Sequence, residues 1–570
     1  MAIDFNFMIG GEAGQGVQSI GFLLAKAFAR GGYHIFADQD YESRVRGGHN
    51  FYRVRVKDSV IGAIAERVDM LIALDNGSIE LHRGELTKDG VIVFDGEEVK
   101  DVNASENLFS VPLNKLAEES AGHKIMANSV ALGVALSLVN YDFRVAENVL
   151  RVYFGSEEIG DRNVKAAKAG YDYTRQNFKG DFEPNLKPIG DDKRMLLNGN
   201  EAIALGAIAA GCKFMAAYPM TPTSSIMEYL AAKAKDFGLA VIQSEDEIAA
   251  INMVVGAGYA GVRAMTATSG GGFCLMVEGL GLAGITETPI VVIEGQRVGP
   301  AIGLPTRTEQ GDLEFILHAS HGEFPRVVLA PATIEDAFWL TVKAFNLAEK
   351  YQLPVIIVTD QHLASSYSTV DRFDLSKLTI DRGLLFSEGK VADYRRHLIT
   401  DSGISPRAFP LQGKALVVTD ADEHDEEGHM IEDAETRTRM MQKRMRKLVG
   451  LKGEINVPEV YGSEGAKTTL IGWGSTGGAI RETVDILSRQ GVSVNSVHLT
   501  ELWPFPAEAM AGIMDKAQNN YVIENNATGQ LAHLIRAETG KKANGNILKY
   551  DGRPFTPEYI IAEMRKEKLV

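Results

Sequence analysis

Cysteine is scarce in this sequence, with two residues, Cys212 and Cys274, in a chain of 570. Two thiols cannot form the disulfide framework of a small secreted domain, and they are too few for a four-thiolate zinc or iron–sulfur site. Electron transfer through a cluster would therefore require a cluster on another chain. The sequence also lacks an apolar run of about 18 residues and the cationic start of a signal peptide, so we expect a cytoplasmic protein.

Positive charge is also in deficit, because 59 Lys and Arg face 75 Asp and Glu, a net charge of -16. Such a chain repels nucleic acid and anionic membranes, so we expect neither as a partner, although a few focused Arg can bind a small acidic substrate. Motifs for a nucleotide phosphate loop, a hydrolase nucleophile elbow and a zinc protease are missing. At roughly 150 residues a domain, the length predicts three or four domains.

The first block, residues 1–180, begins with a strand, a glycine turn and a helix. Residues 4–9 form the expected strand and Gly10–Gly16 the turn. The tripeptide Gly14, Gln15 and Gly16 would present backbone N–H groups at a helix N-terminus, where a phosphate can bind, and Asp38 lies near the spacing of a ribose-binding acid. Because the pattern G-x-G-x-x-S is incomplete, a turn that serves only packing is an equally good interpretation.

Residues 44–55 are locally cationic through Arg44, Arg46, Arg53 and Arg55. In an acidic chain this stretch can meet an anionic ligand or an acidic face of a partner. The alternation of cations with valines favours a simpler interpretation, a half-buried strand at the solvated edge of a sheet.

The second block, residues 195–375, has the pattern of a parallel α/β sheet. Strands are expected near 213–217, 239–242, 263–267, 289–293 and 354–358. The last two are near-continuous apolar runs, which suit strands covered on both faces. Residues 218–225 follow the first strand and offer several hydroxyls at the start of a helix. These hydroxyls either cap the helix or meet a ligand beyond the carboxyl end of the strand.

Two further motifs of the second block carry charge. Residues 244–247 (Ser-Glu-Asp-Glu) match the capping box S-x-x-E, so the pattern alone favours Glu247 as a structural cap. Glu294 and Arg297 follow a buried strand, at the end of the sheet where open α/β folds bind ligands. Arg297 suits a carboxylate, because its planar fork can donate two hydrogen bonds. The polar loop 303–312 comes next and can equally be an ordinary surface loop.

The pattern weakens over residues 376–460. Residues 420–435 are strongly acidic, and we interpret His424 among them as part of a solvated charge run, while 437–447 is basic with helical spacing. We predict an irregular arm or linker with one exposed or partner-facing helix. The last block, residues 461–570, begins with an apolar strand and a glycine turn. The whole chain is therefore expected to be α/β, with three doubly wound domains.

In combination, these motifs resemble those of the 2-oxoacid:ferredoxin oxidoreductases. The glycine turn resembles that of their γ component. Tyr218-Pro219-Met220-Thr221-Pro222 resembles the Y-P-x-T-P signature of their α component, and 243–247, 295–297 and 303–306 recur in the same order. The last block, with 472–475, 522–526 and 529–530, resembles a transketolase C-terminal-like domain. The chain is thus similar to a fused γ–α subunit: a pyruvate:ferredoxin oxidoreductase γ-like domain, then a pyrimidine-type thiamine-diphosphate-binding fold. It is most like the 2-oxoglutarate-type members.

This resemblance implies that the chain helps to interconvert 2-oxoglutarate, CoA and oxidised ferredoxin with succinyl-CoA, CO2 and reduced ferredoxin. The reverse direction fixes CO2, as in a reductive TCA cycle. Pyruvate, branched-chain 2-oxoacids and indolepyruvate are alternative substrates, and a non-catalytic nucleotide-binding or scaffold subunit is a further alternative. The G-D-G…N motif for Mg²⁺ and the diphosphate is absent. We therefore expect a β subunit that supplies Mg²⁺ and a [4Fe-4S] cluster, in an (αβ)2 heterotetramer that reduces ferredoxin.

The resemblance also implies roles for individual residues. Glu247 is expected to hydrogen-bond the aminopyrimidine of thiamine diphosphate, with Glu245 as the alternative, while Tyr218, Pro219 and Thr221 line the same cofactor. Arg297 is expected to bind the substrate carboxylate with Thr221 and Thr306 as hydroxyl partners, and Arg307 is a candidate for a distal carboxylate. Gly14, Gln15 and Gly16 are expected to bind CoA or a phosphate.

Overall fold

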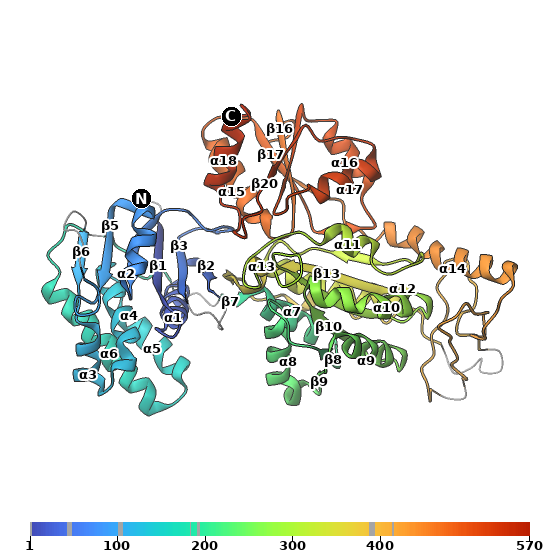
Figure 1. Cartoon of the computed structure of the whole chain (residues 1–570), viewed down its shortest axis with the longest axis horizontal. Coiled ribbons are helices and arrows are strands. Elements are labelled where there is room, and N and C mark those ends of the chain that lie inside the picture. Colours follow the sequence, from blue (N-terminus) through green and yellow to red (C-terminus); the bar gives the residue numbers. More distant parts are fainter. Residues whose placement is uncertain are drawn as a thin grey trace. The chain divides into compact units, whose positions relative to one another are not determined.

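The computed structural model describes residues 3–42, 48–100, 107–182, 184–190, 194–386, 394–412 and 415–570. The chain forms two compact units (Figure 1). Unit 1 comprises Met1–Leu197 with the short segments Ser365–Arg372 and Thr556–Glu558, and unit 2 comprises the remainder. The described residues build three sheets with intervening helices, which confirms the predicted α/β class.

Unit 1 contains an eight-stranded sheet of order β6-β5-β4-β1-β3-β2-β14-β7. Its strands are β1 (Asp4–Glu12), β2 (His34–Asp40), β3 (His49–Lys57), β4 (Val68–Ala73), β5 (Leu86–Phe94), β6 (Asn107–Ser110), β7 (Met195–Asn198) and β14 (Tyr367–Val370). Strands β6, β5, β4 and β1 run parallel, whereas β3 is antiparallel to its neighbours. The prediction of an edge strand around Arg53 is wrong, because β3 lies inside the sheet, between β1 and β2.

The helices of unit 1 are packed closely enough to depend on glycine. They are α1 (Val17–Arg30), α2 (Asn76–His82), α3 (Leu113–Ala121), α4 (Ala127–Leu138), α5 (Phe143–Phe154) and α6 (Glu157–Asn177). Helix α4 is apolar on nearly every side and almost wholly buried, as expected of a helix inside a core. A Cβ on Gly133 would collide with the backbone of Ala167 in α6, so the two helices can approach this closely only with glycine there.

Unit 2 contains a seven-stranded sheet of order β18-β12-β13-β11-β10-β8-β9. Its strands are β8 (Phe214–Ala217), β9 (Ala240–Gln243), β10 (Ala264–Thr268), β11 (Ile290–Gln296), β12 (Val327–Leu329), β13 (Pro354–Asp360) and β18 (Glu501–Trp503). All neighbours are parallel except β12 and β18. The five strands predicted here are all present, and β11 and β13 are buried along their full length.

The connections of this sheet are helical, as parallel pairing requires. The helices are α7 (Gly199–Ala209), α8 (Ser224–Phe237), α9 (Glu247–Tyr259), α10 (Gly270–Ile285), α11 (Leu313–His318), α12 (Ile334–Tyr351) and α13 (Gln361–Ser365). Helices α8, α9, α10, α12 and α13 begin soon after the carboxyl end of a strand of this sheet, whereas α7 follows β7 and α11 follows the long loop after β11. The polar residues at these junctions therefore gather along one edge of the sheet.

The last block adds a five-stranded sheet to unit 2, of order β15-β17-β16-β19-β20. Its elements are β15 (Val460–Gly462), β16 (Thr468–Trp473), α15 (Gly477–Arg489), β17 (Val494–Leu499), α16 (Ala507–Met514), β19 (Asn519–Glu524), α17 (Gln530–Thr539), β20 (Gly545–Leu548) and α18 (Pro557–Lys566). Strand β18 leaves this block and pairs antiparallel with β12. The middle and last blocks therefore share a sheet as well as a core.

The segment after β14 contains α14 (Ala434–Lys452) and is held to the rest of unit 2 by buried charged groups. Lys443 and Lys447 of α14 pair with Glu287, and all three side chains are at most 1% exposed. Our prediction of an exposed helix is therefore wrong for the side of α14 that carries Lys443 and Lys447. The solvated charge run is also wrong for His424, which is fully buried beside His397 at a ring distance of 4.0 Å.

A second buried carboxylate ties the same segment down. Glu349 of α12 accepts hydrogen bonds from Arg263 at 2.7 Å and from Arg407 at 2.5 Å, and it forms an ion pair with Arg382 at 2.6 Å. The Glu349 side chain is 3% exposed. Residues that look like an acidic and basic loop in the sequence thus supply the partners of two buried acids.

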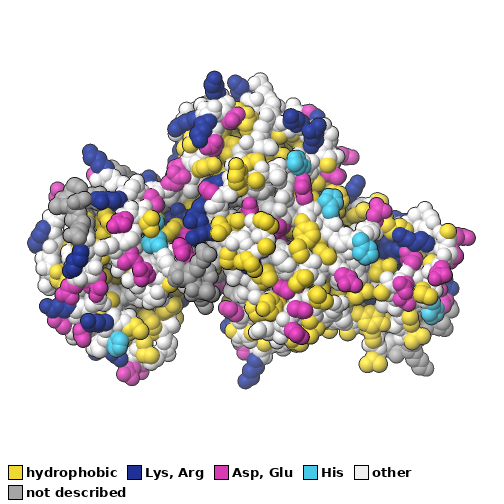
Figure 2. Space-filling view, viewed as in Figure 1, with side chains coloured by type: hydrophobic (Ala, Val, Ile, Leu, Met, Phe, Trp, Pro, Cys, Tyr) yellow, Lys and Arg dark blue, Asp and Glu magenta, His cyan; other side chains and the backbone are white. Residues whose placement is uncertain are grey.

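The outer surface mixes charges of both signs. In Figure 2, acidic and basic side chains are interspersed over the viewed face, and apolar side chains gather over the middle of unit 2. No helix of the described residues is long and apolar enough to cross a membrane.

Candidate active site

The loop between β8 and α8 carries the tyrosine–proline motif. Tyr218 is 40% exposed directly after β8, and Pro219 and Thr221 are half-buried. Thr223 precedes α8 but makes no side-chain cap bond, and its hydroxyl donates instead to the Met220 carbonyl at 3.1 Å. The capping interpretation of these hydroxyls is therefore wrong for Thr223. Tyr218 and Thr221 lie on this loop, at the carboxyl edge of the sheet.

Arg297 lies against this loop. It follows β11, and its Nη1 donates to the carbonyl oxygen of Thr221 at 2.9 Å. Gly295, two residues earlier, makes the approach possible, because a Cβ there would lie 2.5 Å from Thr223 Cγ2. Arg297 is half-buried, and this burial lowers the pKa of its guanidinium from the usual value.

Glu247 is the first residue of α9 and is 4% exposed. Its predicted role as the reaching acid of a capping box is wrong. Asp246 caps the helix by accepting from Ala249 N at 2.7 Å, while the Ser244 hydroxyl donates to the Asp246 carbonyl. The buried Oε1 atom of Glu247 finds no hydrogen-bond partner in the described part of the chain. A buried carboxylate oxygen without a donor is costly, which indicates a site completed by something else.

The two candidate acids differ clearly in their surroundings. Glu245 is exposed, whereas Glu247 is buried and its Oε1 would lie 2.6 Å from a Cβ placed on Gly272 of α10. Glycine at 272 therefore lets α10 pack directly against the unpartnered oxygen. Of the two, Glu247 is the one whose carboxyl group can hold a buried ligand atom.

Thr306 and Arg307 lie on the loop that begins at Arg297. The loop folds back on itself, since Leu304 N donates to the Val298 carbonyl at 3.1 Å and Arg307 N to the Leu304 carbonyl at 3.0 Å. Both predicted residues are half-buried, and the stem of Arg307 packs on Gly552. The structure thus places Thr306 and Arg307 on one loop with Arg297.

The far end of this loop is joined to the last block. Gln310 N donates to the Asn525 carbonyl at 2.7 Å, Gln310 Nε2 donates to the Trp473 carbonyl at 2.9 Å, and Gln530 Nε2 donates to the Gly311 carbonyl at 2.7 Å. Residues 472–475, 522–526 and 529–530, which stood out in the sequence, therefore serve to hold this loop.

Sequence reasoning missed a group of buried acids at the same sheet edge. Glu294 was expected just beyond its strand, facing a ligand. It lies instead within β11, which extends to Gln296, and is fully buried. Asp312 and Asp360 lie nearby, and burial together with these two acids raises the pKa of Glu294 well above its usual value. The sequence feature that could have predicted the burial of Glu294 is a carboxyl residue that directly continues an otherwise apolar strand.

In unit 1, the glycine turn has the backbone that the sequence predicts. Gly14 and Gly16 have φ angles of 96° and 82°, which favour glycine. Gln15 folds back, with its Oε1 accepting from Glu12 N at 2.7 Å. The N-cap of α1 makes no side-chain cap bond, and a Cβ on Gly14 would have nothing within 4 Å. One side of the turn is therefore open, although Gln15 contributes to packing.

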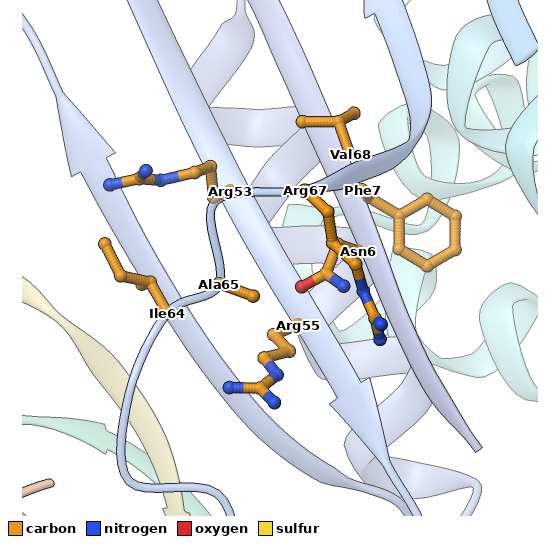
Figure 3. A pocket seen from close by; sticks show the side chains of 8 residues that line it. All are labelled: Asn6, Phe7, Arg53, Arg55, Ile64, Ala65, Arg67 and Val68. Atoms are coloured by element: carbon orange, nitrogen blue, oxygen red, sulfur yellow. The ribbon is translucent and has the colours of Figure 1, made fainter. Parts of the chain in front are cut away.

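Ion pairs within unit 1 involve three other residues that stood out in the sequence, Asp38, Arg53 and Arg55. Asp38 is 5% exposed and paired with Arg53 at 2.6 Å, so its expected role as a ribose acid is wrong. Arg55 pairs with Asp4 at 2.8 Å. Arg53 and Arg55 line a small pocket of about 10 Å³, with room for about one water. Figure 3 shows the side chains that line it. Arg44 and Arg46 lie outside the described residues.

Three family models match successive parts of the chain. Pyruvate ferredoxin/flavodoxin oxidoreductase matches residues 6–173, and the thiamine diphosphate-binding model of pyruvate flavodoxin/ferredoxin oxidoreductase matches 205–443. Core domain II of pyruvate:ferredoxin oxidoreductase matches 466–560. The 2-oxoacid:ferredoxin oxidoreductase α subunit of a Sulfolobus species is 35% identical over 96% of this chain and 95% of its own. The chain belongs to the 2-oxoacid:ferredoxin oxidoreductase α subunits.

Two further proteins are similar to this chain over most of its length. The 2-oxoglutarate oxidoreductase subunit KorA of Mycobacterium tuberculosis is 28% identical, over 93% of this chain and 86% of its own. The structure of 2-oxoglutarate:ferredoxin oxidoreductase from Magnetococcus marinus, with 2-oxoglutarate, coenzyme A and succinyl-CoA bound, covers 100% of both chains. Its TM-score is 0.92 at 33% identity.

The residues of this α subunit fit thiamine diphosphate. The matched family model at 205–443 is a thiamine diphosphate-binding one, and it contains Glu247. A buried carboxyl oxygen without a partner in the described part of the chain is what a pyrimidine ring nitrogen requires from an acid partner. Glu247 would hold the pyrimidine, and the loop with Tyr218 and Pro219 lies at the same edge of the sheet.

Proposed function

We propose that this chain is the α subunit of a 2-oxoglutarate:ferredoxin oxidoreductase. It would convert 2-oxoglutarate, CoA and oxidised ferredoxin into succinyl-CoA, CO2 and reduced ferredoxin, and run in reverse to fix CO2. The observation that carries the proposal is the unpartnered Oε1 of buried Glu247. The substrate assignment is supported by the similarity to the Magnetococcus marinus enzyme over the whole chain.

Glu247 and Arg297 would divide the chemistry between cofactor and substrate. Glu247 would hydrogen-bond the pyrimidine ring and hold its proton in the arrangement that activates the cofactor. Thiamine diphosphate, when bound, supplies the carbon nucleophile and the electron sink for loss of CO2. Arg297, already fixed by its bond to the Thr221 carbonyl, would orient the carboxylate that leaves.

The remaining predicted residues would select the substrates. A 2-oxoglutarate dianion has a distal carboxylate, for which Arg307 is the proposed cation and Thr306 a hydroxyl partner. The open side of the Gly14–Gly16 turn is the proposed site for a phosphate of CoA, because backbone N–H groups at a helix N-terminus favour anions.

A second subunit is part of this proposal. The sequence contains two cysteines, fewer than the four thiolates of a [4Fe-4S] cluster, and lacks the G-D-G…N motif. We therefore assign the cluster, Mg²⁺ and the diphosphate site to a β subunit in an (αβ)2 assembly, with ferredoxin as the electron acceptor.

Substitution of Glu247 by Gln in the assembled enzyme tests the role of this acid. Gln keeps the shape but lacks the charge, so we expect kcat to fall by about 10²–10⁴, the range of a lost acid–base group. Glu245→Gln is the matched control two residues away, and we expect it to retain near wild-type activity. If Glu247→Gln stays as active as the control, Glu247 has only a structural role. That result would favour the alternative in which the chain is a non-catalytic nucleotide-binding or scaffold subunit.

A comparison of kcat/KM across 2-oxoacids tests the substrate. We expect 2-oxoglutarate to exceed pyruvate, branched-chain 2-oxoacids and indolepyruvate in reduction of viologen with CoA. Arg307→Leu should lower kcat/KM for 2-oxoglutarate and leave that for pyruvate nearly unchanged. A wild-type preference for pyruvate would overturn the substrate assignment and leave the family unaffected.

A further inference from the structure

Two histidines and a glutamate form a hydrogen-bonded chain at one edge of the sheet in unit 1. His49 is the first residue of β3, His82 is the last residue of α2, and Glu85 ends the turn that follows α2. The Nε2 atoms of His49 and His82 are 2.7 Å apart, and His82 Nδ1 lies 2.8 Å from Glu85 Oε1. Both distances are those of hydrogen bonds, and we call the three side chains the histidine relay.

The strands of unit 1 hold the histidine relay beside the glycine turn. His49 pairs in register with Glu12, the last residue of β1, and the Gly14–Gly16 turn follows directly. A Cβ on Gly10 would lie 3.3 Å from His49 Cε1, so glycine at this position lets the imidazole lie close to β1. The relay is therefore at the carboxyl end of β1, the end at which α/β sheets bind ligands.

The acid fixes the direction of the hydrogen bonds in the relay. An ionised carboxylate only accepts, so His82 Nδ1 carries a hydrogen and donates to Glu85. A neutral His82 then has no hydrogen on Nε2, so this atom accepts from His49 Nε2. The lone pair of a neutral His49 is therefore on Nδ1. Among the described residues, hydrogen bonds reach only Nε2 of this half-buried ring, so Nδ1 is able to accept a proton.

The surroundings of His49 keep its ring unprotonated. Burial, and then the neighbouring His82, lower the pKa of His49 from its usual value. The acids that act in the opposite direction are Asp75, Asp40 and Glu42. The other charged side chains on the packed elements are Glu12 of β1, Glu85 of the relay and Arg53 of β3. A histidine with a lowered pKa is neutral at physiological pH, and this is the state that can act as a base.

The proposed reaction needs a base for CoA. Oxidation of 2-oxoglutarate with CoA gives succinyl-CoA, CO2, two electrons for ferredoxin and one proton, and this proton is that of the thiol. The S–H bond breaks, and its electron pair stays on sulfur and forms the new bond to the succinyl carbonyl carbon. The proton must be taken up by another group. In the proposed function CoA binds at the Gly14–Gly16 turn, next to the relay.

We propose that His49 is a catalytic residue that accepts the thiol proton of CoA at Nδ1, and that His82 and Glu85 are positioning residues behind it. The inference rests on the proposed function, in which unit 1 binds CoA. When the proton has been accepted, His49 Nε2 still donates to His82, and Glu85 stabilises the imidazolium through His82. In the reverse reaction the imidazolium returns the proton to the departing sulfur.

His49→Gln in the assembled enzyme tests the base. We expect the rate of succinyl-CoA formation to fall by about 10²–10⁴ at neutral pH. The remaining rate should rise about tenfold per pH unit, because it depends on thiolate already formed in solution. CO2 release from 2-oxoglutarate in a single turnover without CoA should be unchanged, which also shows that the variant is folded. His123→Asn changes an exposed histidine of unit 1 and keeps its capping acceptor, so it is the matched control and should behave like the wild type.

Glu85→Gln tests the relay behind His49. Gln keeps an acceptor for His82 but lacks the charge that stabilises protonated His49. The wild-type rate of succinyl-CoA formation should reach a plateau above the pKa of His49. In Glu85→Gln this plateau should begin at a pH lower by about half a unit, since an opposite charge has been removed. A profile identical to that of the wild type would overturn the positioning role of Glu85.

A binding measurement separates this inference from the proposed function. Dissociation constants of CoA and desulfo-CoA, for the assembled wild-type enzyme and for His49→Ala, form a double-mutant cycle. Loss of the thiol should weaken binding by at least about threefold in the wild type, the size of a hydrogen bond, and leave binding to His49→Ala unchanged. A wild-type enzyme that shows this coupling but oxidises no 2-oxoacid would refute the proposed function and leave the thiol site standing. Absence of the coupling, or an equal loss of CO2 release and of succinyl-CoA formation in His49→Gln, would overturn the role of His49.

Discussion

Removal of Arg297 is the most direct test of how this site holds its substrate. Arg297→Ala deletes a half-buried guanidinium that one hydrogen bond already fixes to the Thr221 carbonyl. Loss of a charged partner from such a place costs about 3–5 kcal/mol. Since about 1.4 kcal/mol is a factor of ten, kcat/KM for 2-oxoglutarate should fall by roughly 10²–10³ or more.

The conservative variant refines the same prediction. Arg297→Lys keeps the charge but cannot hold the Thr221 carbonyl and also present a planar fork, so it should recover only part of the loss. Steady-state viologen reduction by the assembled enzyme measures both variants, and added guanidinium should partly restore Arg297→Ala. A fall of less than about threefold in Arg297→Ala would refute the role of Arg297 as the carboxylate anchor.

Three other predictions concern stability and can be measured by urea unfolding of the chain. Glu349→Ala leaves buried arginines unpaired and should lower the free energy of unfolding by about 3–5 kcal/mol, whereas no such loss would mean that the cluster is not a net stabiliser. Burial lowers the pKa of His498 to about 4, so the unfolded chain binds more protons between about pH 6.5 and 4. Stability should fall as pH decreases through that range, and His498→Gln should reduce the slope; an unchanged slope would contradict this assignment. Gly133→Ala should destabilise by about 1–3 kcal/mol through the clash with α6, while Gly84→Ala, with nothing near its Cβ, should be nearly neutral; equal effects would exclude the packing argument.

The parts of the fold that the sequence predicts are those with a strong hydrophobic pattern. The apolar runs of β11 and β13 identify central parallel strands, because both faces of such strands are buried. The three-residue strands β12 and β18 were missed, since three residues contain too little periodicity. They are stabilised by pairing with partners far along the chain, and this is tertiary information.

The candidate site was partly predictable for a related reason. Arg297 and Thr221 were predicted to work together and are in contact, because strand ends of one parallel sheet meet at one edge. The capping box failed because Asp246, also a good cap, competes with Ser244 for the same helix start. The burial of His424 could not be predicted, since it depends on which segments cover this residue.

The segment that bears α14 has few regular elements, yet it cannot be trimmed like an ordinary surface insertion. Glu287 and Glu349 are set in unit 2, and most of their cationic partners come from this segment. Deleting it would strand two carboxylates in a low-dielectric interior. Homologues that lack this segment are therefore expected to lack these two acids as well. A neutral residue at the position of Glu287 or Glu349 would then indicate that α14 is absent.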